Sequence, residues 1–188
     1  MKRAIVLFTI SLIALIIGFT SLTVTNVLKI PYKAYYAFMS ADAKLQVECL
    51  AENIYFEAAH EPDKGKVAVA FVTINRVKSG HFENDICGVV KQKVNGTCQF
   101  SWWCEERPKA ISMARALTDN PSPLYNDIRN LAVHVYANYD KLEDPSRGAL
   151  FYHADYVNPK WRNMEHLTTI GRHIFYIRKD MKNWISQT

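Results

Sequence analysis

One helical pattern of apolar residues ends at a cluster of acidic side chains. The apolar positions recur at i, i+3, i+4, i+7 and i+11, the spacing of a single stripe along a helix, and are Val47, Leu50, Ala51, Ile54 and Ala58. Asp42 is a suitable N-cap, and Pro62 disfavours helical geometry in the residue before it. The pattern therefore predicts a helix from about residue 42 to residue 60.

The three acidic residues near the end of this helix are expected to differ in exposure. Glu52 lies nearly opposite the apolar stripe, so we expect its side chain in water. Glu57 lies on the border of the stripe, where partial burial raises the pKa of a carboxyl toward the range useful to a general acid. Glu61 follows beyond the expected helix end. A glutamate in such a place is more often a surface residue, but Glu57 is the candidate for acid catalysis.

The rest of the chain predicts further helices and a small β element. Helical spacing predicts helices at residues 66–78, 82–91, 107–117 and 124–142. The first of these is apolar on more than one side, so we expect it to be central and largely buried. The Asn95-Gly96 pair predicts a hairpin turn within residues 94–104. Aromatic and branched residues at 149–157 and 173–178 are typical of strands. The expected fold class is α+β, a mainly helical domain with a small β element.

The first residues have the pattern of a membrane-spanning segment. A basic start is followed by residues 4–28 without any charge, long enough to cross a bilayer as a helix. The basic end predicts that the following residues lie outside the cytoplasm. We expect an anchor at residues 1–28, with a cleaved signal peptide as the alternative, a linker at 29–41 and a catalytic domain at 42–188.

The net charge bears on the kind of partner, and the cysteines bear on disulfide or metal binding. The net charge is +5, but there is no dense basic run or nucleic-acid motif, so nucleic acid is a weak hypothesis. An acidic polymer or an anionic surface would suit the charge equally well. The four cysteines, which allow three pairings, are Cys49, Cys87, Cys98 and Cys104. Disulfides are expected in an exported domain, and the zinc alternative lacks a paired C-x-x-C motif.

Six stretches of the chain match a known family. They are residues 49–58 (CLAENIYFEA), 65–77 (GKVAVAFVTINRV), 87–90 (CGVV), 98–102 (CQFSW), 151–157 (FYHADYV) and 170–176 (IGRHIFY). From about residue 49 to residue 178 the chain resembles the bacterial and phage cell wall hydrolases related to the spore-cortex lytic enzyme SleB. It departs from their usual Glu-Ala-Arg-Gly-Glu motif by carrying Ala59-His60 in the middle.

This resemblance implies a lysozyme-like fold, related to lytic transglycosylases, with Glu57 as the general acid that acts on the glycan of peptidoglycan. A hydrolase normally adds a second carboxylate, for which Glu61 is the nearby candidate. A lytic transglycosylase needs one carboxyl group, because the muramic acid 6-hydroxyl attacks within the same sugar. We therefore expect a lytic transglycosylase that cuts the MurNAc–GlcNAc bond. The alternatives are a muramidase hydrolase, an N-acetylmuramoyl-L-alanine amidase and a non-catalytic peptidoglycan-binding module.

Aromatic and polar residues in the matching stretches are candidates for a saccharide cleft. The expected substrate contacts are Gln99, Phe100, Ser101, Trp102, Tyr152, His153, Asp155, Trp161 and His173. The two histidines and Asp155 could also suggest a metal site, but their spacing matches no helical ligand motif, so we expect no metal and no cofactor. We expect a monomer whose partners are peptidoglycan strands and the inner membrane. Its catalytic domain would lie in the periplasm, held at the inner membrane or released to the cell wall.

Overall fold

The structure is a computed structural model that describes residues 32–105 and 121–187. The backbone divides into two compact units, Met1–Met39 and Ser40–Thr188. In the first unit, helix α2 (Tyr32–Phe38) occupies the stretch for which a linker was predicted. The segment 1–28, expected to be an anchor, and the helix expected at 107–117 both lie outside the described residues.

The predicted fold class is corrected. Within the described residues the structure mixes helices with two sheets, and none of its helices is long and apolar enough to cross a membrane. Helix α3 (Ala41–Ala58), the longest of them, has 18 residues and carries charged side chains along its length. A membrane-spanning helix is therefore not part of the described fold. The β portion is also larger than the small element that was expected.

Four helices form one side of the second unit. Helix α3 packs against α4 (Asp63–Ser79), α5 (Ile86–Lys91) and α8 (Pro123–Asn138). Its N-cap is Ser40, whose Oγ accepts the Ala43 N–H at 3.1 Å, and not the predicted Asp42. Helix α4 begins directly after Pro62 and ends at Gly80, which takes the left-handed conformation with φ 68°. The helices predicted from periodicity are thus present in the described part, with shifted ends.

A short ribbon and a short helix follow α5. Strands β1 (Lys93–Val94) and β2 (Thr97–Cys98) pair in antiparallel fashion around Asn95 and Gly96, both with positive φ, which confirms the predicted hairpin. Helix α6 (Ser101–Glu105) comes next. The expected disulfides are formed: Cys98–Cys104 joins β2 to α6, and Cys49–Cys87 joins α3 to α5. The segment between β2 and α6 is thereby closed into a small ring.

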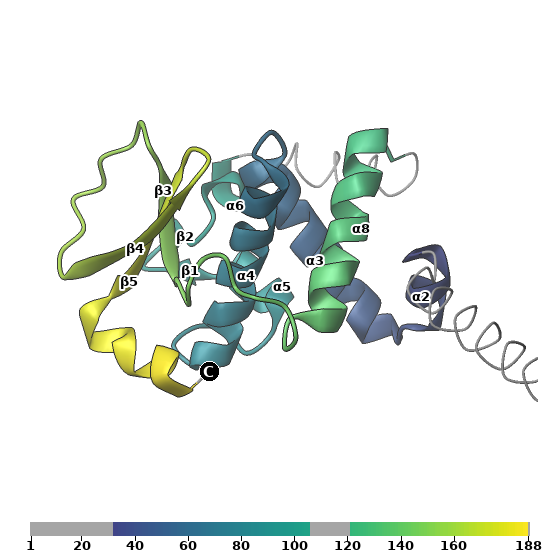
Figure 1. The fold of residues 1–188 in the computed structure, drawn as a ribbon, viewed down its shortest axis with the longest axis horizontal. Helices are drawn as coiled ribbons and strands as arrows, with labels where there is room; N and C mark the ends of the chain where they lie inside the picture. Colours follow the sequence, from purple (N-terminus) through teal and green to yellow (C-terminus); the bar gives the residue numbers. More distant parts are fainter. Residues whose placement is uncertain (1–31, 106–120, 188) are drawn as a thin grey trace, which may run out of the picture. The chain divides into compact units, whose positions relative to one another are not determined.

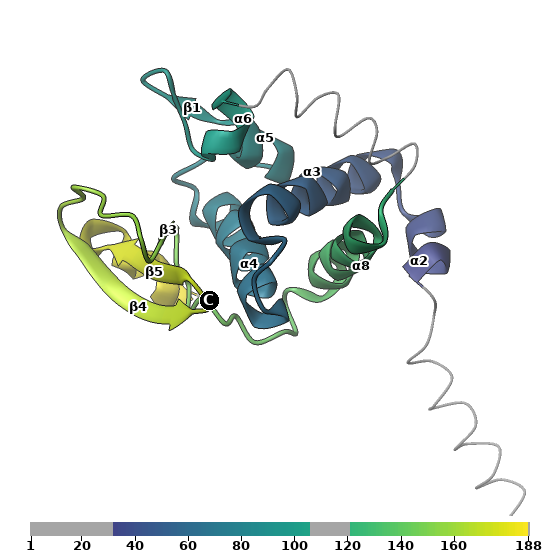
Figure 2. The ribbon, with the colours of Figure 1, turned by 90° about the horizontal axis from the view of Figure 1, so that it is seen from above.

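A three-stranded antiparallel sheet forms the other side of the unit. Its strand order is β3 (Phe151–Ala154), β5 (His173–Arg178), β4 (Met164–Ile170), and the 3-10 helix η1 (Lys179–Gln187) follows β5. Figures 1 and 2 show α4 between this sheet and the pair α3 and α8. The layers meet in an apolar cluster made of Ala68, Val72, Ala149, Ile170 and Phe175. Helix α4 is therefore central and buried, as its sequence predicted.

Candidate functional site

A cavity of about 390 Å³ lies where the end of α3, the β2–α6 segment and the sheet meet. It is lined by Phe56, Glu57, Arg76, Gln99, Phe100, Ser101, Trp102, Tyr152, His153, Ala154, Tyr156, Val157 and His173. The fold thus brings Glu57 together with all the predicted substrate contacts except Asp155 and Trp161. These residues come from four separate stretches of the sequence, so the cavity exists only in the folded chain.

Glu57 projects from the last turn of α3 into this cavity. Its Oε2 accepts a hydrogen bond from the Tyr152 hydroxyl at 2.9 Å. Burial raises the pKa of the Glu57 carboxyl, while the Tyr152 hydrogen bond and the positive charge of Arg76 act in the opposite direction. The raised pKa expected from the border position on the helix is confirmed. Such a carboxyl holds its proton at a higher pH than one in water, which suits a general acid.

Glu52, on the same helix, was predicted to be in water, and this prediction was wrong. Its carboxyl is largely buried, and its pKa is raised to about 7 by burial, with Lys91 opposing and Glu48 reinforcing the shift. The reason is that neighbouring helices cover α3 on more than one side. Glu52 does not line the cavity. Glu52 and Glu57 are thus both partly buried on α3, and of these two only Glu57 lines the cavity.

Tyr152 holds the Glu57 carboxyl from across the cavity. It lies on β3, 95 residues from Glu57, and its ring contacts the His173 ring with centroids 5.0 Å apart. Burial and the neighbouring Glu57 raise the pKa of the Tyr152 hydroxyl well above its ordinary value. The hydroxyl therefore keeps its proton and remains a hydrogen-bond donor to Glu57.

Arg76, on α4, was not among the predicted site residues. Its side chain is buried, and its Nε donates to the Leu150 carbonyl at 2.8 Å. The guanidinium lies over the rings of Phe82, Phe100 and Phe151, at 5.0, 4.8 and 5.8 Å from their centroids. Burial lowers its pKa to about 10, so Arg76 remains a cation at neutral pH. The sequence did hold a signal for it, since Arg76 is a charged residue in a helix predicted to be buried.

The β2–α6 side of the cavity is a rigid aromatic wall. Trp102 donates its indole N–H to Asn53 Oδ1 at 3.0 Å and stacks on Phe56 with centroids 4.4 Å apart. Asn53 in turn donates to Thr73 Oγ1 at 3.1 Å, which links the wall to α3 and α4. Phe100 and Trp102 are only 3% and 6% exposed. They therefore shape the wall, while the more exposed Gln99 and Ser101 are its accessible polar groups.

The two histidines at the cavity have different surroundings. His173 is buried, which lowers the pKa of its ring, and its Nδ1 has no hydrogen-bond partner among the described residues. His153 contacts the Ala154 carbonyl through Nδ1 at 2.8 Å and the Tyr176 hydroxyl through Nε2 at 3.2 Å. Both nitrogens of His153 are thus used within the sheet. Among the described contacts, Asp155 bonds to Arg172 and not to His153.

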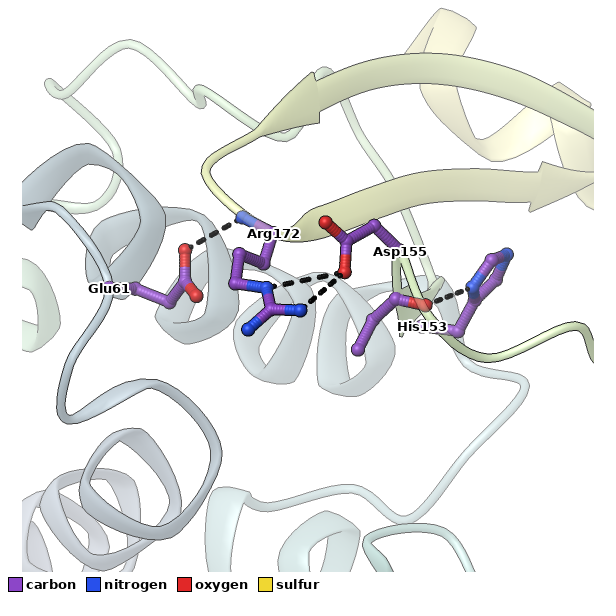
Figure 3. A network of polar contacts seen from close by, with 5 residues as sticks. Glu61, His153, Asp155 and Arg172 are labelled. Atoms are coloured by element: carbon purple, nitrogen blue, oxygen red, sulfur yellow. Dashed lines mark hydrogen bonds and ion pairs between the residues drawn. The ribbon is translucent and has the colours of Figure 1, made fainter.

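Glu61, Asp155 and Trp161 lie outside the cavity lining. Glu61 Oε2 accepts the backbone N–H of Arg172 at 3.0 Å, and Asp155 Oδ1 pairs with the Arg172 guanidinium at 3.3 Å (Figure 3). Trp161 is 44% exposed, and its indole forms T-shaped ring pairs with Phe151, His153 and Tyr176. Glu61 and Asp155 therefore hold the turn between β4 and β5. Within the described ranges, no three His, Cys, Asp or Glu side chains form a group that could hold a metal ion.

The fold is shared with a catalytic domain of known structure. The catalytic domain of the SleB protein from Bacillus cereus has a TM-score of 0.50 at 26% identity, over 73% of this chain and 92% of that one. The catalytic domain of the germination-specific lytic transglycosylase SleB from Bacillus anthracis has a TM-score of 0.49 at 29% identity, over 73% of this chain and 96% of that one.

The sequence comparisons give the family. The profile of the cell wall hydrolase family matches residues 60–176, which is more than half of the chain. Spore cortex-lytic enzymes from Bacillus cereus and Bacillus subtilis are 29% and 28% identical over 131 residues, or 69% of this chain, but these cover only 43% and 36% of those proteins. The chain belongs to the cell wall hydrolase family, a family of peptidoglycan-degrading enzymes, as its sequence motifs indicated. It spans less than half the length of these curated relatives.

Proposed function

We propose that the protein is a peptidoglycan lytic transglycosylase that cuts the bond between N-acetylmuramic acid and N-acetylglucosamine, with Glu57 as its general acid. The observation that carries the proposal is the Glu57 carboxyl itself, buried at the cavity with a raised pKa. Membership of the cell wall hydrolase family supports peptidoglycan as the substrate. The names of the spore cortex-lytic relatives support the same class of polymer.

The two oxygens of the Glu57 carboxyl would have different roles in the reaction. Because Oε2 accepts a hydrogen bond from the Tyr152 hydroxyl, Oε1 is the oxygen left to carry the acidic proton. In the first step that proton passes to the glycosidic oxygen as the C1–O bond breaks and positive charge develops at C1. In the second step the muramic 6-hydroxyl attacks C1 and returns its proton to Oε1. The product is a 1,6-anhydro sugar, and Glu57 is protonated again.

The lining of the cavity favours this reaction over hydrolysis. Glu57 is the one carboxylate among the described residues that line it, while Glu61 and Asp155 are bound to Arg172 outside. An inverting hydrolase needs a second carboxylate to activate water, and a retaining one needs it as nucleophile. Attack by the substrate's own hydroxyl needs neither.

Polar groups around the cavity are suited to hold the sugars. Gln99 and Ser101 would bond hydroxyl and acetamido groups on one side of the cavity. On the other side His173 would do so through Nδ1, which has no hydrogen-bond partner within the described part of the chain. The exposed Tyr156 would stack on a sugar face at the rim. Trp161 would contact a more distant part of the strand, since its exposed indole lies beside His153 and outside the cavity.

The test is the pair of variants Glu57→Gln and Glu52→Gln, assayed on purified peptidoglycan. Both remove a buried carboxyl from α3, but Glu52 does not line the cavity. We expect Glu57→Gln to remain folded and lose lysis, and Glu52→Gln to retain it. Mass spectrometry of the wild-type digest should show 1,6-anhydromuramic ends. Reducing muramic ends would identify a muramidase, new alanine amino groups an amidase, and binding without fragments a wall-binding module.

We also propose that the domain works outside the cytoplasm, at the cell wall. The support is chemical, because two disulfides persist in an oxidising compartment and not in a reducing one. A phage lysin and a bacterial wall-remodelling enzyme both fit this location, and the time of expression during phage growth separates them. Thiol titration of the protein isolated without reductant should find no free cysteine, and four free thiols would contradict the location.

A further inference from the structure

Arg76 is the one lysine or arginine that is fully buried in the described part of the chain, with 4% of its surface exposed. Burying a cation costs free energy, and proteins usually offset that cost with a carboxylate partner. No Asp or Glu of the described residues forms an ion pair with Arg76. Its presence beside the cavity therefore needs another explanation.

Three aromatic rings and one carbonyl take the place of an anion around Arg76. The Leu150 carbonyl accepts from Nε, and the rings of Phe82, Phe100 and Phe151 lie within 6 Å of the guanidinium carbon. Ring faces attract a cation, but they carry no net charge. The side chain is thus fixed in place while its positive charge remains uncancelled.

The positive charge of Arg76 influences the ionisation of Glu57 in the cavity. Arg76 lines the same cavity as Glu57, and its buried Nη1 has no hydrogen-bond partner among the described residues. A nearby cation favours the carboxylate form of an acid, whereas burial favours the neutral form. Glu57 is subject to both influences, and the Tyr152 hydrogen bond adds to that of Arg76.

We propose that Arg76 is a positioning residue for the reaction: its fixed charge allows the single carboxyl of Glu57 to serve first as acid and then as base. This inference rests on the proposed function, in which Glu57 gives up a proton and then takes one back. In so buried a site, a carboxylate without a neighbouring cation would be too unstable to form readily in the first step. Arg76 stabilises that carboxylate without forming a bond that would block Oε1.

The other groups that line the cavity with Glu57 do not supply the positive charge that this role needs. From β3 come Tyr152, which stays neutral because its pKa is well above 10, and His153, which is bonded within the sheet. From β5 comes His173, whose lowered pKa leaves it uncharged at neutral pH. Tyr156 is at the exposed rim, and Gln99 and Ser101 do not titrate in this range.

The test uses Arg76→Gln and Arg76→Met. Glutamine keeps an N–H donor for the Leu150 carbonyl and methionine keeps the length of the stem, but both remove the charge. The titration of Glu57 is followed by the infrared carboxyl band, with Glu57→Gln as the blank, and activity is followed as kcat and KM against pH. We expect the titration and the alkaline limb of the kcat profile to move together to higher pH. The value of kcat should fall, with KM unchanged.

Two matched variants separate charge from structure. Arg76→Lys restores a cation and should move the alkaline limb back toward the wild-type position. Arg129→Met removes a largely buried arginine that pairs with Glu48 at 2.6 Å and does not line the cavity, and it should not move the limb. A folded Arg76→Gln protein with an unmoved Glu57 titration would overturn the inference, as would an equal shift in Arg129→Met. Full activity of Glu57→Gln would instead overturn the proposed function.

Discussion

The two oxygens of the Glu57 carboxyl have different surroundings, and this difference depends on the Tyr152 hydroxyl. We predict that Tyr152→Phe moves the alkaline limb of the kcat profile to higher pH, because removal of the donor raises the pKa of Glu57 further. A hydrogen bond to a charged group contributes about 1.5–3 kcal/mol, so kcat should fall by roughly ten- to a hundredfold.

The control for this variant is Tyr125→Phe. Tyr125 also donates to a glutamate, Glu48, but at 3.5 Å and outside the cavity. The Tyr125→Phe variant should leave the alkaline limb of the kcat profile at its wild-type pH. A Tyr152→Phe protein with the wild-type pH profile would show that the hydroxyl has no part in the titration of Glu57.

Glu52 gives a prediction about stability. The pKa of its carboxyl rises from 4.5 to about 7 on folding, so the folded state binds the proton more tightly. The stability that this proton contributes is present below pH about 4.5 and is lost as the pH rises through about 7. Glu52→Gln should therefore gain stability over wild type across that range, by at most about 3 kcal/mol at pH 8. Urea unfolding at pH 4 and pH 8 measures it, and an equal difference at both values would refute it.

The sequence predicted the place of Glu57 and missed that of Glu52, for a physical reason. A helical wheel finds the border of one apolar stripe, and Glu57 lies on that border. It treats the opposite face as solvent, but α3 and α4 are each covered by other elements on further sides. Whether a polar residue there is exposed depends on the tertiary packing, which the periodicity of a single helix does not contain.

At the level of elements, the two disulfides should have different effects when removed. Cys49 and Cys87 are 38 residues apart, and Cys98 and Cys104 only 6. Loop-closure entropy predicts a stability loss of about 4 kcal/mol for the first pair and about 2 kcal/mol for the second. Replacing the second pair by alanine should lower activity beyond its effect on stability, because the ring holds Gln99 and Ser101 in the cavity wall. Urea unfolding and lysis assays compare the two, and equal specific activities would argue against a role of the ring.

The turn between β4 and β5 provides a test of Glu61. The Glu61 carboxylate accepts the Arg172 N–H, and a side chain on Gly171 would overlap that carboxylate at a residue with φ 56°. We predict that Glu61→Gln keeps most of the activity, since an amide oxygen still accepts the bond, while Gly171→Ala is strongly destabilising. Loss of lysis in a stable Glu61→Gln protein would revive Glu61 as a second catalytic acid.

Some strands were predictable and others were not. The strand at residues 173–178 was predicted with its observed ends, because the stretch is rich in aromatic and branched residues. The strand β4 was missed, since a register shift between His166 and Thr168 interrupts the alternation and several of its residues are polar. A bulge of this kind is fixed by pairing with β5, which a strand's own sequence does not reveal.

For the whole molecule, the charge of +5 predicts salt-dependent binding to an anionic wall polymer. The folded but inactive Glu57→Gln protein should sediment with peptidoglycan at low ionic strength and much less at 0.5 M salt, because the Debye length falls below about 10 Å above 0.1 M. Uncharged chitin is the matched control. Equal binding across the salt series would mean that stacking and hydrogen bonds dominate.

The contact between Tyr152 and Glu57 joins residues 95 positions apart. The carboxyl leaves the ribosome with α3, but its partner strand is made much later and must then pack across α4. A chain interrupted before β3 therefore has the acid without the environment that makes it acidic at the right pH. Synthesis and activation are separated in time by the topology alone. If the protein cuts peptidoglycan as proposed, chains that end before β3 should lack that activity.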